Sequence, residues 1–409
     1  LVFSLLIRLI LWPWTYHSDV TYTYWWGKFA AEFTWKGYYD WLNFGGYAHP
    51  DQPMLNIIYD WLIRLLYNFI YQILWFINVQ VPAFPSKIMS WYFLHGNQAL
   101  LKLPMIIADV LIIYFVYRFI SKNFSAATAK IAAFILSLYP PLIYNSAVWG
   151  SGDSLINLFA LLAIFFLYQK KYLTFTLLFL ISILYKSSLI IWIPIIFVML
   201  LRQKAKFVSL AKMSLVSLIF VYLVSAPFAI KNPFIWFFET FTQKILPGPM
   251  PQITANAMNF WALIFGLEPR LDEILFLNII SIRSLSLIIC FVLFVYILRY
   301  LYHHYSTKNL LLTIVQISLV VFTFMTRMHE RYTFPSLIPL FILCYYNKKY
   351  WKYFIILSIT HCLNVYNWWW VPNIPPLVFL LKSDIFVRLI SLGNTLVTIK
   401  ILKEHESKT

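Results

Sequence analysis

Charge is scarce in this sequence. Of its 409 residues only 11% are charged, whereas 61% are hydrophobic and 20% are aromatic. A soluble domain carries roughly 25% charged residues, because its surface needs groups that water solvates. The shortage of charge therefore excludes a soluble or disordered chain and predicts an all-α polytopic membrane protein. A membrane-spanning helix needs about 20 apolar residues, so the length has room for roughly a dozen spans.

Cysteine and glycine are also scarce. The three cysteines, Cys290, Cys344 and Cys362, lie in apolar runs without CxxC spacing. This pattern excludes a disulfide framework and gives no sign of a zinc site. The ten glycines form no GxxxxGK[ST] or GxGxxG element. The use of ATP or of a nucleotide sugar therefore finds no support.

Twelve apolar runs alternate with polar loops and predict twelve spans. The first run has only fourteen residues, so we expect it to continue before Leu1, and no small-residue cleavage site follows it, which predicts a retained span. The predicted spans are 1–14, 99–120, 126–143, 154–168, 172–185, 187–201, 207–229, 276–299, 309–326, 333–346, 353–371 and 385–402.

Acidic residues are almost absent from one side of this topology. If alternate loops share a side, one side holds only Glu404 and Glu406 of the 15 acidic residues, and the other 13 lie opposite. The basic residues gathered on the first side are Lys122, Lys130, Lys170, Lys171, Arg202, Lys204, Lys206, Lys212, Arg299, Lys308, Lys348, Lys349, Lys352, Lys400, Lys403 and Lys408. By the positive-inside rule this side is cytoplasmic and holds both termini. The net charge of +17 then reports orientation and contact with anionic membrane lipids, and not the binding of nucleic acid.

The predicted outer side carries the polar chemistry. The first loop, 15–98, is too long for an ordinary connection, and its aromatic stretches 20–35 and 54–78 have the helical periodicity of helices lying in the membrane interface. Four polar clusters fall on the same side at span ends: YNSAVWGSGDS (144–154), Lys186 with two serines, ANAMNFW (255–261) and TRMHERY (326–332). Each cluster alone is also compatible with residues that anchor helix ends at the interface. Together on one face, they favour a functional surface.

These motifs resemble the bacterial branch of the GT-C superfamily, integral membrane glycosyltransferases that use polyprenyl-phosphate-linked sugars and include many mannosyltransferases. The resemblance rests on Ser18-Asp19-Val20, LLKLPMIIADVL (100–111), NSAVWGSGDSL (145–155), NAMNFWAL (256–263) and RMHERYTFP (327–335), which occur in family order. One position departs from the family pattern, because Ser151 stands where the WGQ-x-D motif has Gln. The resemblance implies a GT-C fold, an active site in the first outer loop, an acidic base there, which would be Asp19, and catalysis without metal.

The chemistry of such a reaction agrees with these residues. An acceptor hydroxyl must lose a proton as it attacks the anomeric carbon, and Asp19, just beyond the first span, is the candidate base. The leaving phosphate needs positive charge and hydrogen-bond donors, which Arg331, His329 and Lys186 could supply. The alternatives stay open: Asp19 as a helix cap or as a partner of Lys28 or of an arginine, Lys186 as a snorkelling lysine, and residues 329–331 as a salt-bridged turn.

Further residues could bind the sugar or the acceptor. Asp153 follows a glycine turn and could instead cap the span that begins there. Asp51 and His49 lie in a proline-bracketed turn, and Asp51 is the second candidate for the base. Asn256, Asn259 and Trp261 could hydrogen-bond to and stack on a sugar, although core packing also explains the tryptophan. A metal site formed by Asp19, Asp51 and His49 stays open as an alternative, but these residues show no tight metal-ligand spacing, so we expect no metal and no other cofactor. Asp109 needs a partner inside its span, and Lys102 is a distant candidate.

The sequence therefore predicts one transmembrane domain, 1–409, that transfers mannose or another hexose from a polyprenyl phosphate, with inversion, to an acceptor hydroxyl of a glycan, lipid or protein outside the cytoplasm. A secondary transporter or a flippase of a glycolipid precursor is the main alternative. It would show inverted repeats or a polar path through the membrane, and neither is evident. A non-catalytic assembly scaffold is a further alternative, and it would tolerate the loss of Asp19.

Overall fold

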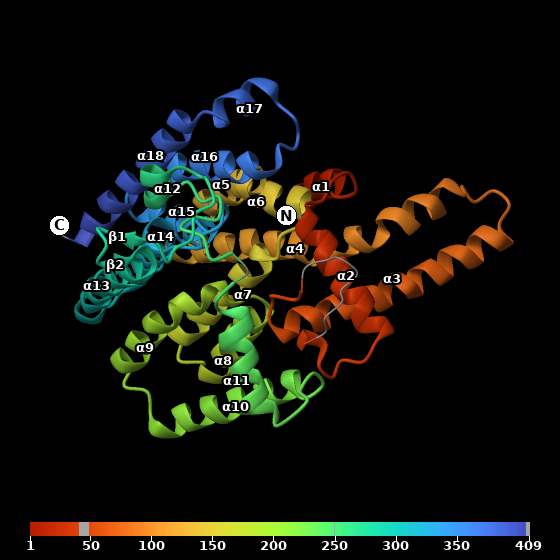
Figure 1. Ribbon diagram of the computed structural model, residues 1–409, viewed down its shortest axis with the longest axis horizontal. Coiled ribbons are helices and arrows are strands. Elements are labelled where there is room, and N and C mark those ends of the chain that lie inside the picture. Colours follow the sequence, from red (N-terminus) through yellow and green to blue (C-terminus); the bar gives the residue numbers. More distant parts are fainter. Residues whose placement is uncertain (41–48, 249, 406–409) are drawn as a thin grey trace. The chain divides into compact units, whose positions relative to one another are not determined.

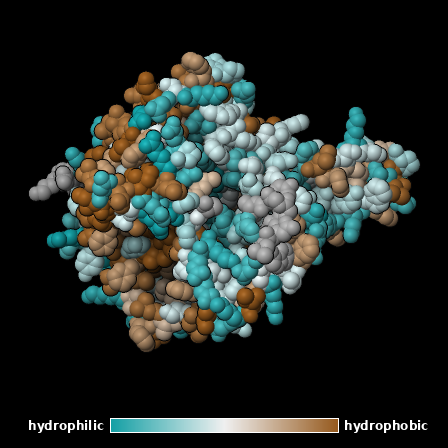
Figure 2. Space-filling model, viewed as in Figure 1, coloured by the Kyte–Doolittle hydropathy of each residue, from teal (hydrophilic) through white to brown (hydrophobic). Residues whose placement is uncertain are grey.

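The computed structural model describes residues 1–40, 49–248 and 250–405, and this part of the chain is mostly helical (Figure 1). It has six helices long and apolar enough to cross a membrane, or seven if the bent pair Ala126–Ser137 and Pro140–Trp149 forms one span. Broad apolar areas also lie on the molecular surface (Figure 2). The described part thus confirms a helical membrane protein. The number of twelve spans stays a prediction.

The chain forms two compact units, whereas the sequence pattern showed no boundary within 1–409. Unit 1 comprises Leu1–Leu189 and Lys206–Pro247, and unit 2 comprises Ile190–Ala205 and Gly248–Thr409. The short helix η3 (Ser187–Trp192) contains the first of the three points where the chain passes between the units. Each unit is described separately.

Unit 1 is a bundle of helices (Figure 1). Within it, α7 packs on α8, α2 packs on α3, and α4 packs on both α5 and α7. Its elements are α1 (Val2–Leu11), α2 (Ser18–Glu32), η1 (Tyr38–Asp40), α3 (Met54–Gln80), α4 (Lys87–Asn123), α5 (Ala126–Ser137), α6 (Pro140–Ile143), η2 (Tyr144–Trp149), α7 (Asp153–Tyr168), α8 (Tyr172–Tyr185), α10 (Phe207–Ser225), α11 (Pro233–Thr240) and η4 (Phe241–Ile245).

The predicted helical stretch 54–78 is confirmed in unit 1, whereas the helix that follows it starts earlier than predicted. The stretch 54–78 belongs to one continuous helix, α3, which is 27 residues long and apolar enough to cross a membrane. Helix α4 begins at Lys87, well before residue 99. The first part of α4 pairs with α3, since the rings of Tyr67 and Tyr92 stack with centroids 5.0 Å apart and the Tyr59 hydroxyl donates to the Leu101 carbonyl at 2.8 Å. The predicted loop 15–98 is therefore largely helical. Its placement in the membrane interface stays a prediction.

A buried ion pair ties α1 to α4. The Arg8 Nε lies 2.8 Å from Asp109 Oδ2, and both side chains are fully buried. Ser146 of η2 also donates to Asp109 Oδ2, at 2.6 Å. The suggestion that Lys102 pairs with Asp109 was therefore wrong. Lys102 instead donates to the carbonyls of Trp12 and Thr15, at 2.8 and 2.5 Å, and so holds the turn between α1 and α2.

Unit 2 is built around α14, the most deeply buried of the candidate membrane helices. Helix α14 packs against α13, α15 and α18. The elements of unit 2 are α9 (Ile193–Arg202), α12 (Phe260–Phe265), β1 (Leu275–Phe276), β2 (Ile280–Ser281), α13 (Ile282–His303), α14 (Thr307–Phe324), α15 (Phe334–Tyr346), α16 (Tyr350–Trp369), α17 (Pro375–Leu381), α18 (Asp384–Leu402) and η5 (Lys403–His405).

Loops that the charge pattern assigned to one side of the membrane also meet in unit 2. Gln203, after α9, donates to the Tyr305 hydroxyl, after α13, at 3.4 Å. Lys349, before α16, forms an ion pair with Glu404 of the C-terminal segment. These contacts agree with the alternation of basic loops. The predicted start of a span at residue 276 was wrong, however, because residues 275–281 form a β-hairpin and α13 begins at Ile282.

Candidate functional site

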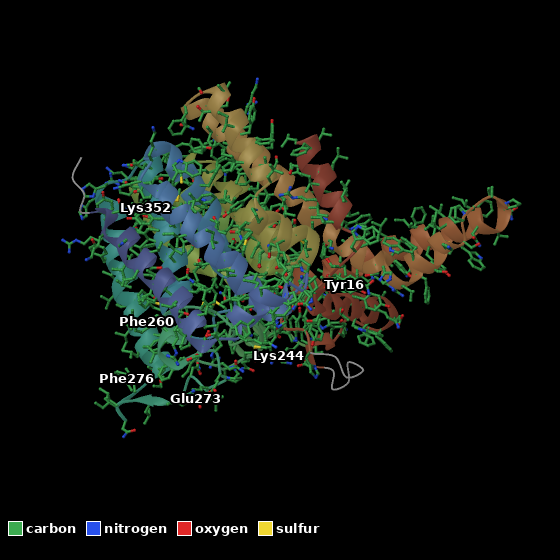
Figure 3. The ribbon with its side chains drawn as sticks, turned by 90° about the horizontal axis from the view of Figure 1, so that it is seen from above. Tyr16, Lys244, Phe260, Glu273, Phe276 and Lys352 are labelled. Atoms are coloured by element: carbon green, nitrogen blue, oxygen red, sulfur yellow. The ribbon has the colours of Figure 1, made fainter. Side chains whose placement is uncertain are left out.

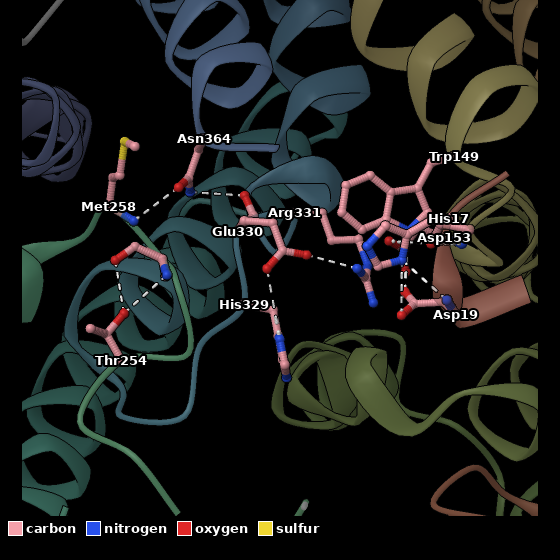
Figure 4. Close-up of polar contacts among 12 residues, drawn as sticks. His17, Asp19, Trp149, Asp153, Thr254, Met258, His329, Glu330, Arg331 and Asn364 are labelled. Atoms are coloured by element: carbon pink, nitrogen blue, oxygen red, sulfur yellow. Dashed lines mark hydrogen bonds and ion pairs between the residues drawn. The ribbon is translucent and has the colours of Figure 1, made fainter. Parts of the chain in front are cut away.

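Unit 1 brings together two motif segments that are 130 residues apart in the sequence. Asp19 is the second residue of α2, and Trp149 is the last residue of η2. The Trp149 indole Nε1 donates to Asp19 Oδ2 at 3.1 Å. Asp19 is also 38% exposed at its side chain, so its carboxylate is both positioned by a donor and open to a ligand (Figure 4). A general base needs this combination of fixed geometry and access.

His17 completes this group, and the sequence analysis did not select it. Its ring stacks on the Trp149 indole with centroids 3.8 Å apart, and its backbone N–H donates to the Trp149 carbonyl at 3.0 Å. The His17 Nδ1 accepts the Asp19 backbone N–H at 3.1 Å, which caps α2. His17 thus fixes the first turn of α2 against Trp149 and orients Asp19.

The turn after Trp149 approaches its neighbours closely. Gly150 has φ +88°, and a Cβ at this position would lie 2.7 Å from Cγ2 of Val20 and 2.9 Å from Cγ of Lys102. Only glycine adopts this conformation and fits this space without displacement of its neighbours. Gly150 therefore lets the motif segment 145–155 lie directly against the start of α2.

Asp153 and Lys186 form the second polar group of unit 1. The Lys186 ammonium lies 2.5 Å from Asp153 Oδ1, and their side chains are 12% and 6% exposed. Ser151, the residue that departs from the family motif, donates to Asp153 Oδ2 at 2.8 Å. Asp153 is also the first residue of α7, where a negative charge is favourable. Because Asp153 neutralises Lys186, this lysine offers less net positive charge to a phosphate group than the sequence suggested.

Unit 2 brings together the other two polar clusters. The backbone of Ala255 and of Asn256 pairs with that of His329. Asn364 of α16 joins the same two segments, since its Oδ1 accepts the Met258 N–H at 3.2 Å and its Nδ2 donates to the Glu330 carbonyl at 2.9 Å (Figure 4). Asn364 is buried. The segment 327–333 is therefore held in place from α16, a helix that carries no recognised motif.

His329, Glu330 and Arg331 form a charged turn. The Arg331 Nη1 donates to Glu330 Oε1 at 2.7 Å, and His329 Nδ1 lies 3.8 Å from Glu330 Oε2. Burial opposes the ionisation of Glu330, but the Arg331 charge and a hydrogen bond from His329 outweigh it and hold the pKa of this carboxyl below its ordinary value. The side chain of His329 is 24% exposed and that of Arg331 is 12% exposed. His329 is thus the most accessible of the three predicted phosphate ligands, since the side chain of Lys186 is also 12% exposed.

Asn259 and Trp261 have structural partners in unit 2. Asn259 caps α12 by accepting the N–H groups of Trp261 and Ala262, each at 3.1 Å, and donates to the Phe322 carbonyl at 3.0 Å. The Trp261 indole donates to the Phe324 carbonyl at 2.8 Å, and both side chains are buried. Core packing therefore accounts for them without a sugar. Asn256 is half-buried, with φ +65°.

The predicted pair His49 and Asp51 lies just before α3 in unit 1. Asp51 is half-buried and its Oδ1 accepts a hydrogen bond from Gln52 at 2.9 Å, whereas His49 is exposed. The Gln52 carbonyl accepts the Tyr39 hydroxyl at 2.8 Å. Residues 41–48, between Tyr39 and this turn, lie outside the described part of the chain. Within the described part, no three His, Cys, Asp or Glu side chains are placed to hold a metal ion.

No protein-family model matches this chain, and no curated protein matches it either. The resemblance to GT-C enzymes therefore rests on the sequence motifs alone and stays a prediction.

Proposed function

We propose that this chain is a multi-pass membrane glycosyltransferase of the GT-C type. It transfers mannose or another hexose from a polyprenyl phosphate to an acceptor hydroxyl outside the cytoplasm, and the configuration at the anomeric carbon inverts. The proposal keeps twelve spans, both termini in the cytoplasm and a first outer loop with interfacial helices. The observation that carries it is the geometry of Asp19, a partly exposed carboxylate oriented by the indole of Trp149 and the ring of His17.

The proposed reaction is a single displacement. The acceptor oxygen forms a bond to the anomeric carbon, the bond between that carbon and the phosphate oxygen breaks, and the electron pair leaves with the phosphate. Asp19 accepts the proton of the acceptor hydroxyl. His329 and Arg331 bind the phosphate through charge-assisted hydrogen bonds. Because Asp153 neutralises Lys186, we assign to these two residues the binding of sugar hydroxyls, in which carboxylate and ammonium serve as acceptor and donor.

The Trp149 bond to Asp19 supports a role for Asp19 as a base more than one as a structural cap. The residue that caps α2 is His17, whose Nδ1 accepts the Asp19 N–H. Asp19 does not pair with Lys28, since the Lys28 ammonium lies over the Trp25 ring, 4.7 Å from its centroid. Other groups thus cap α2 and contact Lys28, while the Asp19 carboxylate has the Trp149 indole at Oδ2 and His17 Nδ1 3.1 Å from Oδ1 and is 38% exposed.

Sealed vesicles distinguish this proposal from transport. The purified full-length chain is reconstituted with polyprenyl-phosphate mannose carrying a radioactive sugar, together with a glycolipid extract as acceptor. The enzyme converts the donor into free polyprenyl phosphate and a mannosylated product, both identified by mass spectrometry. A transporter or flippase would leave the donor chemically intact and change only its leaflet. If the donor exchanges between leaflets and no free polyprenyl phosphate forms, the proposal that the chain is a glycosyltransferase is refuted.

A further inference from the structure

A short β-hairpin in unit 2 carries an exposed apolar tip. Strands β1 and β2 pair antiparallel, with Leu275 opposite Ser281 and Phe276 opposite Ile280. The Ile279 N–H donates to the Phe276 carbonyl at 3.1 Å and closes the turn. Figure 3 shows this hairpin projecting from unit 2, with Phe276 on it and Glu273 before it.

The side chains of this tip are among the most exposed apolar groups of the chain. Leu277 is 74% exposed and Ile279 is 81% exposed, while Leu275 and Phe276 are each about half exposed. No charged residue occurs from Ile274 to Ile282. Single exposed leucines are common on proteins, but adjacent ones on a projecting turn mark a contact surface.

The backbone of the turn disfavours an apolar residue at its tip. Leu277 has φ +52° and Asn278 has φ +56°, so both central residues are in the left-handed region. Asn, Asp and Gly are favoured in such turns, and a residue such as Leu is strained there. Asn278 follows this preference, whereas Leu277 departs from it. A leucine kept in a strained and exposed position suggests that the side chain itself has a partner.

The position of the hairpin indicates which partner this is. Ser281 is the N-cap of α13, whose length and composition allow it to cross a membrane. At about 3.3 Å per residue, the tip lies within roughly 15 Å of the end of that helix. Charged residues lie only where the hairpin joins the rest of unit 2. There Arg283 is exposed, and Arg327 donates two hydrogen bonds, of 2.7 and 3.1 Å, to the buried Asp272.

We propose that the tip of this hairpin, residues 275–279, inserts into the membrane leaflet at the N-terminal end of α13. The apolar side chains contact lipid acyl chains, and Arg283 lies at the level of the headgroups. The pairing of β1 with β2 satisfies only the backbone groups that lie between the two strands, so the tip enters no deeper than the boundary between headgroups and acyl chains. A second protein chain fits this surface less well, because a stable protein interface buries about 1,200–2,000 Å², and a few side chains on a narrow turn offer much less.

A fluorescent label at the tip tests this contact. Cys290, Cys344 and Cys362 are replaced by alanine, Leu277 is replaced by cysteine, and the full-length protein is labelled with an environment-sensitive dye in nanodiscs of phosphatidylcholine and phosphatidylglycerol. Doxyl groups on the lipid chains should lower the emission at least twofold, while aqueous iodide should have little effect. Glu268→Cys is the matched control. Glu268 precedes the hairpin, and its side chain is 81% exposed, so iodide and not the doxyl groups should quench a label there.

Two outcomes would overturn the proposal. If iodide quenches the Leu277→Cys label as strongly as it quenches the Glu268→Cys label, the tip lies in water. Protection from both quenchers would mean that protein covers it. Leu277→Asn provides a second measurement. It suits the backbone of the turn, so thermal stability in detergent should not fall, whereas quenching by doxyl lipid of a label at Ile279→Cys should decrease at least twofold. Unchanged quenching in this variant would also contradict the proposal.

Discussion

Removing one partner of the ion pair between Arg8 and Asp109 should be one of the most destabilising single changes in unit 1. Both side chains are fully buried, and the pair joins α1 to α4. Arg8 also donates to Ser4 Oγ at 2.7 Å and to the Ser137 carbonyl at 3.2 Å, while Ser146 donates to Asp109. Removal of one charge leaves the other buried without its partner. We therefore choose Arg8→Met and Asp109→Leu as the perturbation.

The size of the effect follows from this burial. Breaking a buried ion pair by removing one partner costs about 3–5 kcal/mol, because an uncompensated charge stays in a medium of low dielectric constant. Replacing both partners by apolar residues of similar size removes that penalty, and the pair as a whole is often near neutral. Each single variant should therefore lose about 3–5 kcal/mol of the free energy of unfolding. The double variant should lose much less than the sum of the two.

Equilibrium unfolding in mixed micelles measures these free energies. The purified protein is titrated with a denaturing detergent, helicity is followed by circular dichroism, and the coupling energy is taken from the double-mutant cycle. The matched control is Lys244→Met, which breaks the ion pair with Asp40 in the same unit. Both of those side chains are more than a third exposed, so the loss should stay below about 1 kcal/mol. Additive losses in the cycle, or single losses as small as that of the control, would refute the reasoning.

Three further predictions concern the candidate site. Gly150→Ala should lower both thermal stability and transfer activity, because its Cβ meets neighbouring side chains at 2.7 and 2.9 Å, whereas Gly393→Ala has nothing within 4 Å and should leave both unchanged. Asn364→Ala should remove two buried hydrogen bonds, lower the free energy of unfolding by about 2–4 kcal/mol and reduce kcat for transfer. Asn364→Asp should lose at least as much in both assays, because it keeps the acceptor for the Met258 N–H but turns a buried carboxylate oxygen toward the Glu330 carbonyl. Burial raises the pKa of Glu330, but the Arg331 charge outweighs it and holds this pKa below its ordinary value. The contribution of the Glu330 carboxylate to stability is therefore full above the unfolded pKa of about 4.3 and is lost as the pH falls through the lower folded pKa. Glu330→Gln should therefore flatten the acid limb of the stability profile, and an unchanged limb would contradict this assignment.

Most of the helical architecture follows from the sequence, because long uncharged apolar runs have few stable arrangements other than membrane helices. The sequence pattern predicted the wrong helix boundary where apolar residues continue past the end of a helix. Residues 275–281 are as apolar as the span that follows, so composition does not separate the hairpin from α13. Lys87 begins α4 early because the segment before residue 99 packs on α3. Pairing of that kind is tertiary and leaves little trace in local periodicity.

The candidate site was predicted in part. The sequence predicted Asp19 and the segment 145–155 on the same side of the membrane, but their contact through Trp149 was not predicted. The partner of Asp109 lies 101 residues away in the sequence, so spacing along one helix suggested the wrong residue. Asn364 lies in a helix without a recognised motif, and nothing in its sequence context indicates that it holds Met258 and Glu330. Choices of partner such as these depend on which helices pack together.

The rate of sugar transfer by the Asp19→Asn variant tests the central claim most directly. Free polyprenyl phosphate is quantified by mass spectrometry from the purified chain in nanodiscs, with Glu32→Gln as the control because it removes a carboxylate from an exposed position on the same helix. Loss of a general base lowers a rate by about 10²–10⁴-fold. We predict a fall of that size for Asp19→Asn and none for Glu32→Gln. Transfer by Asp19→Asn at the rate of the unmodified chain would contradict the account.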